Sequence, residues 1–150
     1  MKLIGVLLIS LIPIIIGIKK YMLLLNKANI SKRIFEIFHR LLDEIKYTQK
    51  ELRCILKKEN EDFFIFANPI FLNEKKLTEN GFKTEEIAPF KDFLKVVQSG
   101  DKGYIFSQGE VVLKKIEGVK IKSEKELMET GRLYITVFLG LSAVVFLALI

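Results

Sequence analysis

Few side chains in this sequence could do chemistry, and their spacing does not assemble a catalytic site. The chain of 150 residues has one histidine, His39, and one cysteine, Cys54. Their separation corresponds to about 22 Å along a continuous α-helix, which is too far for a thiolate–imidazole pair. A zinc-protease helix needs two histidines four residues apart, and a P-loop needs Gly-x4-Gly-Lys-Ser/Thr, but neither pattern occurs. The residues therefore give no support for catalysis, a metal or a cofactor, and we expect a protein that is not an enzyme.

The remaining ionisable residues are typical of a solvated surface. Asp43 and Glu44 lie among lysines, and His39 is on the same polar side. Cys54 is expected to be a reduced cytosolic thiol, since one cysteine cannot form a disulfide framework. The net charge of +6 is made of both signs without a basic tract. We therefore expect neither nucleic acid nor a small-molecule substrate as a partner.

The elements that must position any functional surface include two runs without charge, residues 3–18 and 133–150. As helices they would extend about 24 and 27 Å, against a hydrocarbon layer of about 30 Å. The first run contains Pro13 and ends at Lys19 and Lys20, whose long side chains can reach the headgroups while the helix continues to residue 25. The alternatives are a cleaved signal peptide, for which no cleavage site is visible, and, for residues 133–150, the buried helix of a soluble protein.

Basic residues predict the orientation of these spans. Lys19 and Lys20 follow the first span, and Arg132, next to Tyr134, precedes the second. Positive flanks remain in the cytoplasm, so the middle of the chain is expected there, close to membrane lipids. The predicted domains are a transmembrane helix at 1–25, a cytoplasmic helical domain at 26–132 and a transmembrane helix at 133–150.

The middle region begins with an amphipathic helix. Its apolar residues recur with a period of 3.6, at positions 34, 37, 38, 41, 42 and 45, then 52, 55 and 56. Asn29 or Ser31 is the expected N-cap. Thr48 and Glu51 have the form of a capping box, which favours two helices, 31–47 and 49–59, over one continuous helix.

The rest of the middle region is less regular. A helix over 71–77 would end at Asn80-Gly81, and another would start at Thr84, or near Pro89, and run to Ser99-Gly100. Residues 104–106 and 111–113 could form a short hairpin. The alternative is a long helix from about residue 103 into the second span, and the sequence leaves this choice open.

One segment carries a recognisable pattern. Residues 40–52 read Arg-Leu-Leu-Asp-Glu-Ile-Lys-Tyr-Thr-Gln-Lys-Glu-Leu, and the chain opens with Lys-Leu-Ile-Gly at 2–5. With the span at each end, this resembles the stage III sporulation protein AB family of endospore-forming bacteria. The matching or nearly matching residues are Leu41, Glu44, Ile45, Tyr47, Thr48 and Leu52. The chain departs from the family where a proline after the threonine is replaced by Gln49, and near the start of the last span, at Ile135 and Gly140.

The resemblance implies a mainly α fold in which transmembrane helices flank a small antiparallel cytoplasmic bundle. That bundle is similar to the cytoplasmic domains of type II secretion and type IV pilus platform proteins. The implied role is a scaffold of the complex between mother cell and forespore, in the cell membrane on the mother-cell side, with other proteins of the complex and its cytoplasmic ATPase as partners. The expected contact residues are Asp43, Lys46, Tyr47 and Lys50. A small pore-forming or holin-like protein is the alternative, although the spans offer few polar residues, namely Ser10, Thr136 and Ser142.

Overall fold

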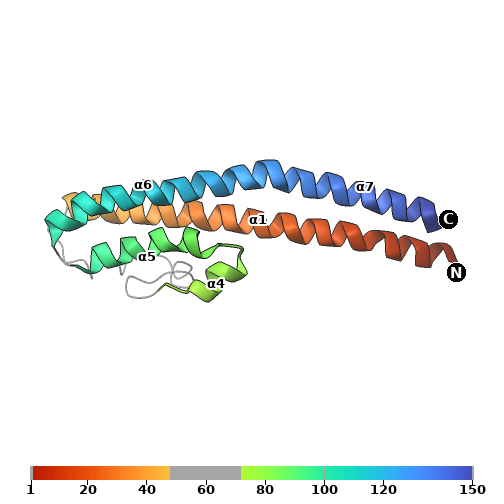
Figure 1. Cartoon of the computed structure of the whole chain (residues 1–150), viewed down its shortest axis with the longest axis horizontal. Coiled ribbons are helices and arrows are strands. Elements are labelled where there is room, and N and C mark those ends of the chain that lie inside the picture. Colours follow the sequence, from red (N-terminus) through yellow and green to blue (C-terminus); the bar gives the residue numbers. More distant parts are fainter. Residues whose placement is uncertain (1, 48–71, 100, 150) are drawn as a thin grey trace. The chain divides into compact units, whose positions relative to one another are not determined.

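The computed structural model describes residues 2–47, 72–99 and 101–149, and these residues are almost entirely helical (Figure 1). No strand occurs in these three ranges, so the mainly α class is confirmed. The elements are the α-helices α1 (Lys2–Tyr47), α4 (Glu74–Glu79), α5 (Thr84–Gln98), α6 (Lys102–Glu126) and α7 (Arg132–Leu149), with the π-helix η1 (Leu127–Gly131) between the last two.

The chain divides into two compact units. Unit 1 combines both ends of the chain, Met1–Ala28 and Ser123–Ile150, and unit 2 is the intervening Asn29–Lys122. Helices α1 and α6 each contribute residues to both units. The two units are described separately below.

Unit 2 is organised around the amphipathic stripe predicted for the first helix. Ile34, Phe38, Leu41 and Ile45, at spacings of four and three residues, are all buried. Phe38 stacks on Phe93 of α5 with ring centroids 4.2 Å apart. The stripe is confirmed to residue 45, whereas its predicted continuation and the bend at Thr48 lie outside the described residues.

Helix α6 supplies a second stripe to the same core. Ile105, Val112, Ile116 and Val119 are buried, with Gly109 between them. Of the two alternatives that the sequence leaves open here, the long helix is confirmed and the hairpin at 104–106 and 111–113 is not formed. Strand-forming residue types are overridden here, because the same side chains fit one face of a helix at spacings of three and four residues.

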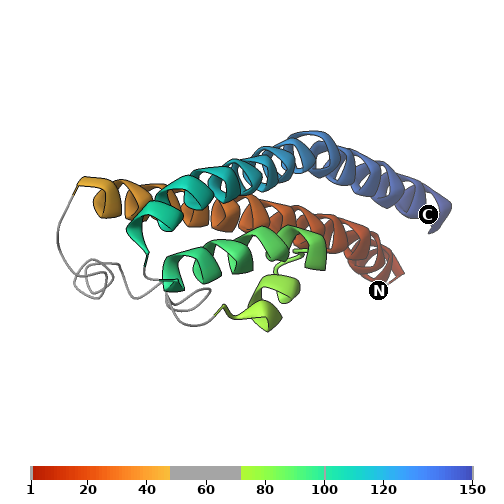
Figure 2. The same cartoon turned by 60° about the vertical axis from the view of Figure 1, so that its left-hand side comes forward.

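Within unit 2, α6 runs antiparallel to the part of α1 that belongs to the unit, and the two lie side by side in both views (Figures 1 and 2). The ammonium group of Lys120 lies 4.9 Å from the centre of the Phe35 ring. A Cβ atom added to Gly109 would lie 2.6 Å from Cδ1 of Leu42. Gly109 therefore lets the two helices approach closely.

Helices α4 and α5 have well-defined ends. The side chain of Asn73 accepts a hydrogen bond from the amide of Lys76, so α4 begins at residue 74, later than predicted, and it ends at Asn80. Gly81 follows with a φ of 86°, as expected for a residue after a helix C-terminus. Helix α5 starts at Thr84 as predicted, and the alternative start near Pro89 is wrong because Pro89 lies inside it.

The first helix is longer than expected. A span ending near residue 25 and a new helix capped by Asn29 or Ser31 were predicted, but α1 is continuous from Lys2 to Tyr47. Asn29 and Ser31 therefore lie in the interior of a helix and do not cap one, and Ser31 is fully buried. The physical reason is that no proline or glycine occurs between residues 18 and 47, so nothing in the sequence forces a break.

Unit 1 consists of the first part of α1, the end of α6, η1 and α7. Its apolar side chains are mostly exposed, among them Ile4, Leu8, Ile15, Leu133, Val144 and Leu147. By length and composition, the continuous helices Ile4–Tyr47 and Lys102–Leu149 are both able to cross a membrane. Only 17% and 6% of their most apolar 18-residue windows are buried.

Candidate functional site

The residues that carry the resemblance and those predicted to contact a partner fall into two groups at the end of α1. Leu41 and Ile45 are buried in the core of unit 2, so they serve packing. Asp43, Lys46 and Tyr47 are exposed, Tyr47 at 78%. Thr48, Lys50 and Leu52 lie outside the described residues. Glu44 is half-buried and has an interaction partner within the chain.

The exposed residues form a small mixed surface, the α1 end surface, made of His39, Asp43, Lys46 and Tyr47. Nδ1 of His39 lies 3.0 Å from Oδ2 of Asp43, one helical turn away. The ammonium group of Lys46 lies 4.5 Å from the centre of the Phe106 ring and 5.6 Å from that of Tyr47. An exposed aromatic residue such as Tyr47 suits contact with another protein, while the arrangement holds no nucleophile activated by a base.

The predicted membrane-flanking residues all belong to unit 1. Lys19, Lys20 and Arg132 are exposed, and Tyr134 is half-buried with its ring centroid 6.3 Å from that of Phe138.

Within unit 1, α1 is antiparallel to the segment made of the end of α6, η1 and α7, and four contacts define this pairing. The Ser142 hydroxyl donates a hydrogen bond to the Ser10 carbonyl oxygen. A Cβ atom added to Gly17 would lie 2.8 Å from Cβ of Phe138, and one added to Gly131 would lie 3.1 Å from Cδ2 of Tyr21. The fourth contact is the ion pair between Lys27 and Glu126. As the residue number along α1 increases from 10 to 27, the number of the contacting residue decreases from 142 to 126. The four contacts are therefore consistent with one antiparallel register.

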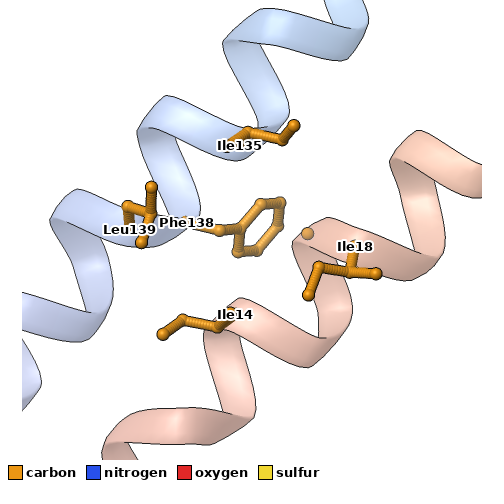
Figure 3. Close-up of a pocket in the computed structure, with 6 residues that line it drawn as sticks. Ile14, Ile18, Ile135, Phe138 and Leu139 are labelled. Carbon is orange, nitrogen blue, oxygen red and sulfur yellow. The ribbon is translucent and has the colours of Figure 1, made fainter.

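An apolar groove of about 240 Å³ lies between α1 and α7 (Figure 3). Its lining residues are Ile14, Gly17, Ile18, Ile135, Phe138 and Leu139. The missing side chain of Gly17 leaves the Phe138 ring against the backbone of α1. This groove could not be predicted from the sequence, because it depends on the pairing of residues more than a hundred positions apart.

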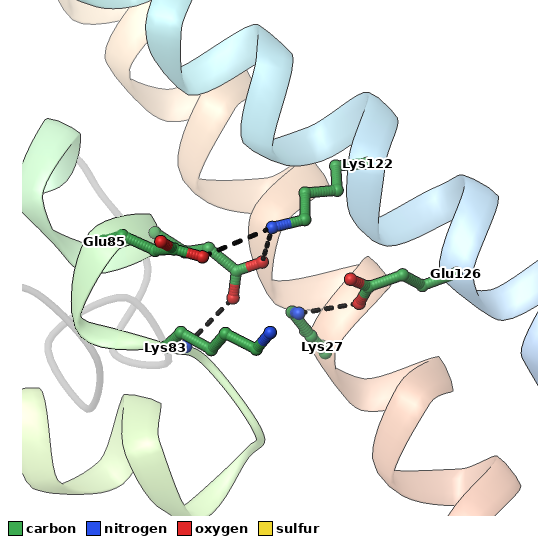
Figure 4. Close-up of polar contacts among 6 residues, drawn as sticks. Lys27, Lys83, Glu85, Lys122 and Glu126 are labelled. Atoms are coloured by element: carbon green, nitrogen blue, oxygen red, sulfur yellow. Dashed lines mark hydrogen bonds and ion pairs between the residues drawn. The ribbon is translucent and has the colours of Figure 1, made fainter.

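A buried ion pair lies beside the π-helix of unit 1 (Figure 4). Nζ of Lys27 is 2.8 Å from Oε2 of Glu126, with 4% and 30% of the two side chains exposed. Lys27 lies two residues beyond the predicted first span, and its side chain is enclosed. A buried charge of this kind requires a partner, and Glu126 supplies one.

The π-helix changes which residues face the interior of unit 1. Ser123 is buried, and an α-helical repeat of seven would place the next buried position at Thr130. Because a π-helical turn holds an extra residue, the buried position is instead Gly131. The hydropathy of the sequence did not reveal this shift, since serine and glycine carry no apolar signal.

Unit 2 has its own buried carboxylate, Glu86. Oε2 of Glu86 accepts a hydrogen bond from the Lys83 amide at 2.9 Å, and Oε1 lies 3.0 Å from Nζ of Lys122. The neighbouring Glu85 is exposed and 3.7 Å from the same ammonium group. Glu86 thus completes the N-terminus of α5 and joins it to α6, which is a structural role.

The described residues contain no group of three or more histidine, cysteine, aspartate or glutamate side chains placed to hold a metal ion. The candidate functional features are therefore the α1 end surface of unit 2 and the helix pair of unit 1. No family model matches the chain, and comparisons with curated proteins and with solved structures find no significant match.

Proposed function

We propose that the protein is a non-enzymatic membrane scaffold in which unit 1 is a transmembrane helical hairpin and unit 2 a small cytoplasmic antiparallel bundle. The observation that carries the proposal is the exposure of the apolar runs. The buried helix of a soluble protein would hide most of such a run, whereas 6% of the window in the second helix is buried. Exposed apolar surface on this scale is unfavourable in water and favourable in lipid.

The polar groups in the spans support the same environment. Ser142 donates its hydroxyl hydrogen to Ser10, the Ser10 hydroxyl bonds to the Leu7 carbonyl at 2.9 Å, and Thr136 bonds to the Arg132 carbonyl at 3.1 Å. Each hydroxyl therefore has a partner without water, as a hydrocarbon environment requires. The same contacts disfavour the holin-like alternative, because these hydroxyls are engaged with backbone instead of lining a polar path.

The cytoplasmic placement of unit 2 rests on the positive flanks. Lys19, Lys20 and Arg132 are exposed at the ends of the apolar runs that lead toward unit 2 in the sequence. Positive residues of this kind favour retention on the cytoplasmic side.

The scaffold role is proposed from the resemblance together with the α1 end surface. The resemblance of residues 40–52 to the sporulation family implies the ATPase and other proteins of the sporulation complex as partners. Asp43, Lys46 and Tyr47 are exposed and can be reached by a partner, while Leu41 and Ile45 are buried in the core of unit 2. We propose that this surface docks the cytoplasmic ATPase.

The test has a membrane arm and a docking arm. After alkaline extraction the chain is expected to remain with the membrane pellet, and its release would contradict the spans. In pull-downs with the ATPase, Asp43→Lys and Tyr47→Ala are expected to weaken recovery. Glu79→Lys, a matched charge change on an exposed residue of α4, is expected to leave recovery unchanged. Equal recovery with all variants would contradict docking at the α1 end surface while leaving the membrane arm intact.

A further inference from the structure

The groove of unit 1 has a cation at one end. Arg132 precedes Ile135 by three residues and Leu139 by seven, so it lies on the face of α7 that lines the groove. Lys20 follows Gly17, another lining residue, by three residues on α1. Both cations therefore lie within about one helical turn, roughly 5 Å along the axis, of the groove.

These cations are available to an external anion. Arg132, Lys19 and Lys20 are exposed, and none of the three pairs with a carboxylate among the described residues. The nearest carboxylates in the sequence of unit 1 have other partners, since Glu126 pairs with Lys27 at 2.8 Å and Glu129 lies 3.8 Å from Lys125.

The body of the groove suits hydrocarbon. Its walls are the side chains of isoleucine, leucine and phenylalanine residues, and Ile18 and Leu139 at its edge are 53% and 52% exposed. The groove is thus open along its side, and its volume of about 240 Å³ holds a short length of acyl chain.

We propose that unit 1 binds one anionic phospholipid, with an acyl chain in the groove and the phosphate group at Arg132, assisted by Lys20. The proposal rests on the transmembrane placement of unit 1 and adds a ligand to it. A phospholipid matches this site because an apolar groove has exposed cations at its end. A lipid with a neutral headgroup would bind in the groove alone, and a free phosphate would bind to the cations alone.

The experiment reconstitutes the full chain in phosphatidylcholine nanodiscs containing a small fraction of a photoreactive phospholipid, with the reactive group in the acyl chain. Two probes with the same acyl chain are compared, phosphatidylglycerol and phosphatidylcholine. The expected result is labelling of residues 14–18 and 135–139 about fivefold stronger with the anionic probe, since one basic residue near an anionic headgroup contributes about 1 kcal/mol.

Matched variants separate the parts of the site. Arg132→Gln is expected to reduce labelling by the anionic probe to the level seen with the neutral probe. Lys125 is also exposed and lies seven residues earlier, and Lys125→Gln is expected to leave labelling by both probes unchanged. Ile135→Phe is expected to fill the groove and lower labelling with both probes, whereas Ile15→Phe, on an exposed residue outside the groove, does not.

Equal labelling by the two probes, or an Arg132→Gln variant that labels like the wild type, would overturn the proposal. Displacement of the anionic probe by soluble glycerol phosphate would also overturn it, because it would indicate an anion site independent of the acyl chain. A chain that reaches the nanodisc and fails these comparisons refutes the lipid site alone. A chain that is not retained by the nanodisc refutes both the site and the proposed membrane function.

Discussion

The hydroxyl of Ser142 donates a hydrogen bond to the main-chain carbonyl oxygen of Ser10, joining two residues 132 positions apart. The Ser10 hydroxyl is turned to its own helix and bonds to Leu7. Ser142→Ala is expected to destabilise the helix pair by about 0.5–1 kcal/mol, the usual worth of one such bond in a membrane protein. The measurement is the midpoint of unfolding in mixed micelles titrated with dodecyl sulfate, followed by circular dichroism.

Ser10→Ala is the matched control for that prediction. It removes a hydroxyl of the same kind but leaves the backbone carbonyl that Ser142 uses, so its midpoint is expected to stay near the wild type. A larger loss for Ser10→Ala than for Ser142→Ala would contradict the assigned roles.

Gly17 tests how closely the two helices of unit 1 approach. A Cβ at this position would lie 2.8 Å from Cβ of Phe138, so Gly17→Ala is expected to destabilise the pair by about 1–3 kcal/mol. Gly140→Ala is the control, because a Cβ there meets no atom within 4 Å. The same micelle titration measures both, and indistinguishable midpoints would argue against this register.

The glycines of α6 give opposite expectations in unit 2. Gly118 has open space around it, so Gly118→Ala is expected to raise stability by up to about 1 kcal/mol through helix propensity. Gly109→Ala gains the same propensity but places a Cβ 2.6 Å from the end of the Leu42 side chain, which must move. Thermal unfolding is therefore expected to rank Gly118→Ala above Gly109→Ala, and the reverse order would refute the packing described for α6.

Glu126 and Glu129 differ in burial although they are three residues apart. Glu126→Gln leaves the enclosed Lys27 ammonium without its carboxylate and is expected to cost several kcal/mol, up to about 3–5. Glu129→Gln breaks an exposed pair with Lys125, 3.8 Å apart, and is expected to cost less than about 0.5 kcal/mol. Chemical unfolding of both variants in one detergent is the check, and similar losses would show that the Lys27 pair is not enclosed.

Glu85 and Glu86 form a second matched pair at the start of α5. Glu86→Gln weakens both the bond from the Lys83 amide and the contact with Lys122, so a loss of about 1–3 kcal/mol is expected. Glu85→Gln alters an exposed side chain and is expected to be nearly neutral. The measurement is the denaturant midpoint for the unfolding of unit 2. A larger loss for Glu85→Gln than for Glu86→Gln would contradict the role of Glu86 at the N-terminus of α5.

The sequence was informative wherever apolar spacing follows a local rule. The buried stripe from Ile34 to Ile45 was predictable from the 3.6-residue period of apolar side chains, and it is observed. The start of α5 at Thr84 was predictable from the acidic residues in its first turn, and it is observed as well. The burial of Lys27 could not be predicted, because burial of a charge depends on its partner and Glu126 is distant in the sequence.

The register between α1 and the C-terminal helices could not be predicted, because it too depends on contacts between residues distant in the sequence. Gly109, Ser123 and Gly131 occupy buried positions without any hydropathy signal, so the second stripe looked irregular in the sequence. The extra residue of the π-helix then displaces the repeat by one position, which no periodic pattern anticipates. Within the segment that carries the resemblance, burial separates Leu41 and Ile45 from Asp43 and Tyr47, a distinction that requires the packed structure.

The central claim is that two membrane spans hold unit 2 in the cytoplasm, and site-directed labelling tests it most directly. In a Cys54→Ser background, a cysteine is introduced at the exposed Lys115 of α6. An impermeant maleimide is expected to label Lys115→Cys only after the cells are permeabilised. Labelling of intact cells to the same extent would place unit 2 outside and contradict the account.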